Sequence, residues 1–154
     1  MAKVVVYTDG GASGNPGPGG YGAVMISGEH RKELSGAFRL TTNNRMELLA
    51  VIAALEALKS PGTDVTIYSD SKYVVDSVLK KWVFGWVKKN FKNKKNSDLW
   101  KRFLKIYVVH DVKFVWVKGH AGNELNEVAD RLAVSAYQEG VLEIDEVYEA
   151  TNKD

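Results

Sequence analysis

Four acidic residues stand where a strand or a helix can present a carboxylate group: Asp9, Glu47, Asp70 and Asp130. The first and third directly follow apolar runs, 4–8 and 65–69, and the other two lie in segments with helical spacing. Carboxylates that converge from strand ends and helices provide the oxygen ligands that Mg²⁺ prefers. Because two carboxylates ~4 Å apart repel by ~4 kcal/mol at an effective dielectric of ~20, four of them in one cleft favour bound cations. The sequence therefore predicts a metal-dependent enzyme.

Three of these acids also have a structural explanation when each is taken singly. Glu47 lies three positions after Asn44, which is the spacing of a helix capping box. Asp70 could cap the helix that follows it, and Asp130 could flank an apolar stripe. Asp9 has no helix directly after it to cap, so a structural role explains it least well.

The elements that must position these acids can be read from hydrophobic spacing and turn residues. Strands are expected at residues 3–9, 21–27, 32–40, 65–69 and 112–117. We expect a helix that Asn43 or Asn44 can cap and that runs to about residue 59, and further helices at about 71–79, 98–108 and 124–138. A shorter helix and a polar loop at 92–97 are expected between residues 80 and 98. Three strands followed by strands that alternate with helices predict a mixed α/β sheet, in a single domain spanning residues 1–154.

Residues 10–20 contain six glycines and two prolines, which predicts a loop. Overlapping it, Gly17 to Gly22 matches the dinucleotide-binding pattern G-x-G-x-x-G. That pattern needs a helix immediately afterwards to hold the pyrophosphate, whereas residues 23–26 read as a strand. A tight strand connection that lets another backbone approach is the better interpretation.

The charge is unevenly distributed, although the formal net charge is only +2. Residues 80–105 hold ten basic residues and one acid, a charge of +9, whereas residues 139–154 hold six acids and one lysine, a charge of −5. The basic block indicates a polyanionic partner, but a lysine-rich solvated surface explains it equally well. Trp82 and Trp86, four residues apart among lysines, are the best candidates for lying along a nucleic-acid backbone. The acidic tail, about residues 141–154, has no clear period.

The amino-acid composition limits the kinds of metal site and the cellular compartments that fit this chain. The chain has no cysteine, which excludes disulfides and thiolate metal sites and fits a reducing cytoplasm. Its apolar runs are too short to cross a bilayer and its first residues open directly into a strand, so we expect neither a membrane anchor nor a signal peptide. Nothing resembles an association helix, which favours a monomer without an obligate protein partner.

Read together and in order, the motif-bearing segments closely resemble type 1 ribonuclease H over essentially the whole chain up to about residue 140. These segments are residues 7–11, 14–22, 41–48, 69–71, 117–122 and 129–130. The resemblance implies a ribonuclease H-like fold, a five-stranded mixed sheet flanked by helices. It also implies an endonuclease that hydrolyses the RNA strand of RNA–DNA hybrids with little sequence specificity and leaves 5′-phosphate and 3′-hydroxyl ends.

The resemblance implies that the four acids named above are the family's metal-binding carboxylates, brought together at one edge of the sheet. Two Mg²⁺ ions would then clamp the scissile phosphate of the bound substrate, with Mn²⁺ as a substitute. His120 matches a histidine on a mobile loop of the family that assists proton transfer or product release.

The resemblance also implies a set of substrate contacts. Residues that match contacts to the hybrid near the cut, largely through its RNA strand, are Asn15, Asn43 and Asn44, and Thr42 matches a phosphate contact on the DNA strand. Lys72 stands where many relatives have a glutamine that reads the minor groove. Because a lysine cannot accept a hydrogen bond, its role in reading the substrate is open. The basic segment at about 80–100 matches a protrusion with which some bacterial members grip the duplex, and its candidate contacts are Trp82, Trp86, Lys88 and Lys89.

Three other functions remain as alternatives. A hybrid-binding module would keep the fold without the chemistry, although all four acids and the histidine are present. A nuclease of the same broad superfamily that acts on DNA, such as an integrase or a resolvase, would share the acids. A phosphate-accepting receiver domain would explain an acidic pocket but neither the asparagines nor the basic block.

Overall fold

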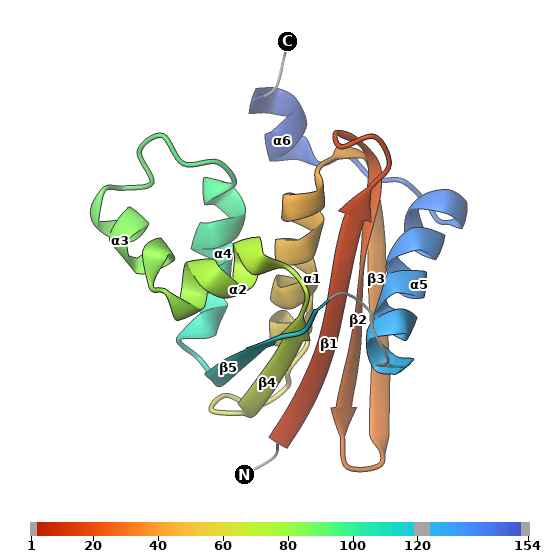
Figure 1. The fold of residues 1–154 in the computed structure, drawn as a ribbon, viewed down its shortest axis with the longest axis vertical. Helices are drawn as coiled ribbons and strands as arrows, with labels where there is room; N and C mark the ends of the chain where they lie inside the picture. The colour runs from red at the N-terminus through yellow and green to blue at the C-terminus, as the bar shows by residue number, and fades with distance from the viewer. Residues whose placement is uncertain (1–2, 119–123, 152–154) are drawn as a thin grey trace.

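The computed structural model describes residues 3–118 and 124–151, which form a five-stranded sheet with helices on both sides (Figure 1). The strands are β1 (Lys3–Ala12), β2 (Gly17–Ser27), β3 (His30–Thr41), β4 (Asp64–Ser69) and β5 (Asp111–Trp116). The helices are α1 (Asn43–Glu56), α2 (Lys72–Leu79), α3 (Trp82–Lys88), α4 (Ser97–Tyr107), α5 (Glu124–Glu139) and α6 (Glu146–Thr151). No helix within these described ranges is long and apolar enough to cross a membrane.

The sheet is mixed, as the sequence predicts. Its strand order is β3-β2-β1-β4-β5. β1 runs antiparallel to β2 and parallel to β4, and β4 runs parallel to β5. The carboxyl ends of β1 and β4 therefore meet at the same edge, which is where ligand sites of such sheets form. Figure 1 shows α1 and α5 on opposite sides of β1 and β2, against which both helices pack.

The prediction of a loop over residues 10–20 is wrong, because β1 and β2 take up all but residues 13–16. The glycines permit close packing instead. A Cβ atom added at Gly10 would lie 2.3 Å from the backbone of α1, and one added at Gly22 would lie 2.4 Å from the backbone of α5. The absence of a Cβ thus lets both helix backbones approach the strands, in line with the interpretation that another backbone comes close here.

Neither Glu47 nor Asp70 caps a helix. The hydroxyl of Thr42 caps α1 by accepting from the backbone N–H of Arg45 at 3.3 Å, so the prediction of an asparagine cap is wrong. The hydroxyl of Ser71 caps α2 by accepting from a backbone N–H at 3.2 Å. Capping therefore explains neither carboxylate, and the structural alternative for these two acids falls away.

The basic segment forms α3 and the loop after it, which lie to one side of the sheet (Figure 1). Left-handed backbone conformations at Lys81 (φ 62°) and Asn90 (φ 52°) bracket α3 and turn the chain at both of its ends. Val83 of α3 and Trp100 of α4 are fully buried. The protruding segment is therefore attached to the rest of the molecule through the apolar core.

The acidic tail is more ordered than its lack of a period indicates. Glu143 forms a β-bridge with Phe38 of β3, and α6 follows. The guanidinium of Arg39 donates to the carboxylate of Glu149 at 2.8 and 2.9 Å. Because these contacts join the tail to β3, the order of the tail depends on partners far away in the chain and leaves no trace in the tail's own periodicity.

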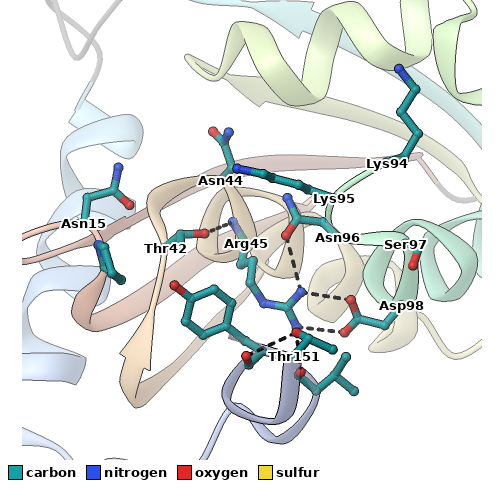
Figure 2. A pocket seen from close by; sticks show the side chains of 13 residues that line it. Asn15, Thr42, Asn44, Arg45, Lys94, Lys95, Asn96, Ser97, Asp98 and Thr151 are labelled. Carbon is teal, nitrogen blue, oxygen red and sulfur yellow. Dashed lines mark hydrogen bonds and ion pairs between the residues drawn. The ribbon is translucent and has the colours of Figure 1, made fainter. Parts of the chain in front are cut away.

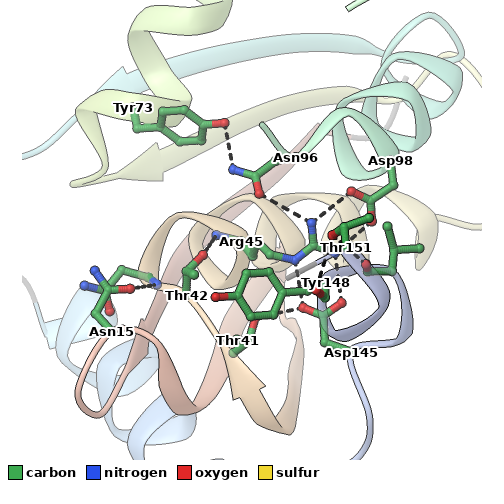
Figure 3. Close-up of polar contacts among 12 residues, drawn as sticks. Asn15, Thr41, Thr42, Arg45, Tyr73, Asn96, Asp98, Asp145, Tyr148 and Thr151 are labelled. Carbon is green, nitrogen blue, oxygen red and sulfur yellow. Dashed lines mark hydrogen bonds and ion pairs between the residues drawn. The ribbon is translucent and has the colours of Figure 1, made fainter. Parts of the chain in front are cut away.

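Arg45 connects this tail to the starts of α1 and α4, as Figure 3 shows. Its guanidinium donates two hydrogen bonds to Asp98 and two to Asp145, all at 2.7 to 2.8 Å. The hydroxyl of Thr41 also donates to Asp145 at 2.8 Å. The side chain of Arg45 is only 4% exposed, and this burial opposes its charge, but the hydrogen bonds to Asp98 and Asp145 outweigh burial and raise its pKa. One buried cation thus joins three distant segments of the chain.

We expect Arg45→Met to lower the free energy of unfolding by about 3–5 kcal/mol, because it leaves two carboxylates without their shared cation. Arg31→Met is the matched control, since it removes the same group from an exposed pair with Glu33 and should cost about 1 kcal/mol or less. Denaturation in urea measures both values. Equal losses in the two variants would show that the buried pairs are not what holds the tail in place.

Candidate active site

Three carboxylates converge at the carboxyl edge of the sheet. Asp9 lies in β1, Asp70 directly follows β4, and Glu47 lies near the start of α1. One oxygen atom of each lies within 4.8 Å of the others. The close packing of α1 on Gly10 contributes to this, because the backbone that comes nearest to Gly10 belongs to Met46 and Glu47. The structure thus brings together three of the four acids singled out from the sequence.

The fourth acid, Asp130, reaches the cluster from α5. Its carboxyl group makes a side-chain hydrogen-bonding contact with Asp9. Gly22 lies opposite Asp9 in the antiparallel pairing and, having no side chain, lets the backbone of Ala129 come close. Two helices and two strand ends therefore supply the four carboxylates, and the two glycines let the helices reach the strands.

Gathering these charges raises the proton affinity of the buried acids. Burial, the contact with Asp130 and the charge of Asp70 raise the pKa of Asp9 to about 8. Burial and the charges of Asp9 and Asp70 raise the pKa of Glu47 well above its usual range. The Oε1 atom of Glu47 is fully buried and has no hydrogen-bond partner within the described residues. An all-oxygen donor set with an unpaired buried oxygen fits a hard divalent cation, which would bind in place of the protons.

A cavity of about 560 Å³ opens beside the start of α1. Figure 2 shows the amide and ammonium groups around it, and its lining includes Asn15, Thr42 and Asn44, three of the predicted substrate contacts. Residues 94–96, from the loop before α4, line it as well. From the sequence, residues 92–97 are only a polar loop within the basic block, so the lysines at 94 and 95 were the available signal for this part of the lining.

Asn15 and Asn43 brace the connection between β1, β2 and α1. The amide oxygen of Asn15 accepts from the backbone N–H of Asn43 at 2.9 Å, and the amide oxygen of Asn43 accepts from the backbone N–H of Ala12 at 2.6 Å. Thr42 likewise uses its hydroxyl oxygen as an acceptor when it caps α1. In all three side chains the oxygen atom accepts the hydrogen bond. The amide N–H groups of the two asparagines and the hydroxyl hydrogen of Thr42 are the donors that could bind a phosphate or ribose oxygen.

Lys72 is the predicted substrate contact nearest in sequence to the acids. It begins α2, two residues after Asp70. Its ammonium group lies 4.8 Å from the ring centroid of Trp116, the last residue of β5. His120 was also predicted as a site residue, and it lies outside the described residues.

The predicted contacts on the protruding segment are of two kinds. Trp82 is 47% exposed, whereas Trp86 is half-buried and packs edge-on against Trp100 with ring centroids 5.8 Å apart. Lys88 and Lys89 are exposed at the end of α3. Trp82 is therefore the tryptophan with more surface to offer a ligand, and Trp86 serves the core as well.

Comparison with known proteins places the chain in a family. The RNase H family matches residues 1–138. The chain is 55% identical over 152 residues to a Ribonuclease H of Rippkaea orientalis, which covers 96% of this chain and 93% of that protein. It is 50% identical over 150 residues to a Ribonuclease HI of Synechocystis, which covers 94% of this chain and 93% of that protein.

Solved structures agree with the sequence comparison. The crystal structure of LC9-RNase H1, a type 1 RNase H with the type 2 active-site motif, matches with a TM-score of 0.81 and 32% identity over 99% of this chain and 83% of that chain. LC11-RNase H1 in complex with RNA/DNA hybrid matches with a TM-score of 0.64 and 29% identity over 87% of this chain and 96% of that chain.

The structure is an α/β protein whose mixed sheet carries, at its carboxyl edge, a cluster of acids that could hold a divalent metal ion. More particularly, the chain belongs to the RNase H family. It is an endonuclease that hydrolyses the RNA strand of RNA–DNA hybrids, and its family uses divalent metal ions for this reaction.

The raised pKa values predict how the stability of the metal-free protein depends on pH. The pKa of Asp9 rises from 3.8 to about 8 on folding, so between these pH values the folded state holds a proton that the unfolded chain has lost. The free energy of unfolding should therefore fall as pH rises from about 4 to about 8. Glu47 acts in the same direction, because its pKa is also raised.

Thermal unfolding of the metal-free protein between pH 5 and pH 8 measures this decline. Added Mg²⁺ or Mn²⁺ should reduce it, because these ions bind the deprotonated carboxylates. Glu47→Gln should raise the melting temperature of the metal-free protein at pH 8 and weaken the response to metal. A melting temperature that stays constant over this pH range would contradict the assignment of the raised pKa values.

Proposed function

We propose that the four acids hold two Mg²⁺ ions at the scissile phosphate and that cleavage leaves 5′-phosphate and 3′-hydroxyl ends. The observation that carries this proposal is the convergence of oxygens from Asp9, Glu47 and Asp70 within 4.8 Å, with Asp130 in contact with Asp9. Two such ions, when bound, supply activation of the attacking water and stabilisation of the leaving oxygen. Mn²⁺ should substitute, because it also accepts oxygen ligands.

The four acids differ in how accessible they are to a substrate. Asp9 is only 6% exposed, so it forms the innermost part of the site. Glu47, Asp70 and Asp130 are half-buried, and one oxygen atom of Glu47, Oε1, is fully buried. His120 completes the proposal as the group that assists proton transfer or product release.

The substrate would be read through its sugars and phosphates. Because the 2′-hydroxyl of RNA both donates and accepts hydrogen bonds, the amides of Asn15, Asn43 and Asn44 can identify the RNA strand. The hydroxyl of Thr42, which lines the cavity with the lysines at 94 and 95, suits a phosphate of the DNA strand. Contacts of this kind do not address base edges, so we expect little sequence specificity.

The protruding segment would add affinity without sequence preference. Trp82 offers an exposed ring, Lys88 and Lys89 offer charge, and the Trp86 ring lies 5.2 Å from the ammonium group of Lys94. Lysines that neutralise about four phosphates would make log affinity fall against log salt with a slope of roughly −3 to −4. We also propose that the protein is a monomer and that it acts in the cytoplasm. The absence of cysteine fits a reducing compartment of that kind.

The first test is cleavage of three labelled duplexes, RNA–DNA, DNA–DNA and RNA–RNA, with Mg²⁺. We expect cleavage of the RNA strand of the hybrid alone, and Asp70→Asn should abolish it while hybrid binding persists, because a neutral amide binds Mg²⁺ poorly. Binding of the hybrid by the unaltered chain without cleavage would favour a binding module, and preference for duplex DNA would favour a DNA-acting nuclease. Turnover by Asp70→Asn close to that of the unaltered chain would refute the metal assignment.

The second test concerns the protruding segment. Reversing two charges with Lys88→Glu and Lys89→Glu should raise KM about tenfold at moderate salt and flatten the salt slope by about two units, with a smaller effect on kcat. The control is the double variant Lys32→Glu/Lys59→Glu, which reverses the same number of charges. Both lysines are exposed and lie at the other end of the sheet, near the β2–β3 turn and the end of α1. An equal change in both double variants would mean that only net charge matters and that the segment does not grip the duplex.

A further inference from the structure

Trp116 is a large aromatic residue whose surface is 41% exposed, and it lies beside the acidic cluster. It ends β5 and pairs in the parallel register with Ser69, the residue before Asp70. Its indole N–H donates to the backbone carbonyl of Asp70 at 3.2 Å. The roles described so far assign nothing to this tryptophan, although it contacts the backbone of a predicted metal ligand.

The ammonium group of Lys72 lies close to the ring of Trp116. The Nζ atom of Lys72 lies 4.8 Å from the ring centroid, within the range of cation–π attraction. No ion pair within residues 3–118 and 124–151 involves Lys72. Its charge is therefore available to a ligand, and contact with the ring limits the conformations of a side chain that otherwise loses much freedom on binding.

The position of Lys72 close to Asp70 determines which phosphates of a bound substrate its side chain can reach. Lys72 stands two positions after Asp70, so their Cα atoms are at most ~7 Å apart. Consecutive phosphates of one strand are ~3.4 Å apart along a nucleic-acid helix axis. A phosphate held at the acidic cluster therefore brings its neighbours within reach of Lys72, while a cation there also offsets the repulsion between the cluster and the substrate.

We propose that Lys72 contacts a backbone phosphate next to the scissile one and that Trp116 is the positioning residue that holds the Lys72 ammonium group for this contact. The inference rests on the proposed function, because it concerns the same substrate at the same edge of the sheet. It gives Lys72 a role that needs no hydrogen-bond acceptor, which the lysine side chain lacks.

The test is a salt series of steady-state cleavage of an RNA–DNA hybrid by Lys72→Gln, Trp116→Leu, Trp116→Phe and the double variant Lys72→Gln/Trp116→Leu. Lys72→Gln should raise KM about three- to tenfold and flatten the salt slope by about one unit, with kcat nearly unchanged. Trp116→Leu should change KM and the slope in the same direction, and in the double variant it should add nothing further. Trp116→Phe keeps a ring face and should keep the slope, although it lacks the N–H.

Lys113→Gln is the matched control, because it removes one lysine charge from β5 at a site where the ammonium group already pairs with Asp64 at 3.1 Å. Its slope should equal that of the unaltered chain. The ring-current shift of the Lys72 ε-methylene protons, measured by NMR on the unaltered protein, tests the contact with Trp116 even if Trp116→Leu fails to fold.

An unchanged salt slope in Lys72→Gln would overturn the phosphate contact. Additive effects in the double variant, or the absence of a ring-current shift, would overturn the positioning role of Trp116. Failure of the proposed function would look different, because the unaltered chain would then not cleave the hybrid with Mg²⁺ at all.

Discussion

The convergence of four like charges in a partly buried place is the constraint on which this structure depends. Among Asp9, Glu47 and Asp70, at separations of up to 4.8 Å, each pair of charged oxygens would repel by at least ~3.5 kcal/mol at an effective dielectric of ~20. The acids cannot relax away from one another, because they stand on elements whose backbones are in direct contact, α1 over Gly10 and α5 over Gly22. The glycines of β1 and β2 therefore determine where the helices, and with them the acids, lie. In the metal-free protein the repulsion between the acids is reduced because Asp9 and Glu47, whose pKa values are raised, retain protons.

Helix α1 carries two ionisable side chains of opposite type, Arg45 and Glu47, and the contrast between them separates structure from function. Arg45 is fully compensated, since Asp98 and Asp145 each accept two of its hydrogen bonds. Two residues later, Glu47 has one buried oxygen without a partner in the described part of the chain. A satisfied buried network specifies a fold and needs nothing more, whereas an unsatisfied carboxylate among other carboxylates requires a proton or a cation. Arg45 therefore stabilises the arrangement that presents Glu47.

The strands, most helices and the convergence of the four acids could be predicted from the sequence, because each depends on local spacing. Asp9 and Asp70 end apolar runs, and strands that end at one edge bring such residues together. The role of residues 10–20 could not be predicted in this way. Their glycine content indicates a loop, and only the positions of α1 and α5 reveal that the same glycines are strand residues under close contact. The order of the tail and the place of Trp116 likewise depend on partners distant in the sequence.

The charge that the surface presents to a nucleic acid depends on which charged side chains are already paired within the protein. A nucleic acid is repelled by the acidic cluster, so its strands must be held by cations nearby. The acid that lines the cavity beside α1 is Asp98, and Arg45 compensates it. Two acids of the tail, Asp145 and Glu149, are paired with Arg45 and Arg39. Lys94 and Lys95 are therefore the charges that a strand entering the cavity would meet, and a chain with a net charge of only +2 can present a positive surface next to a negative site.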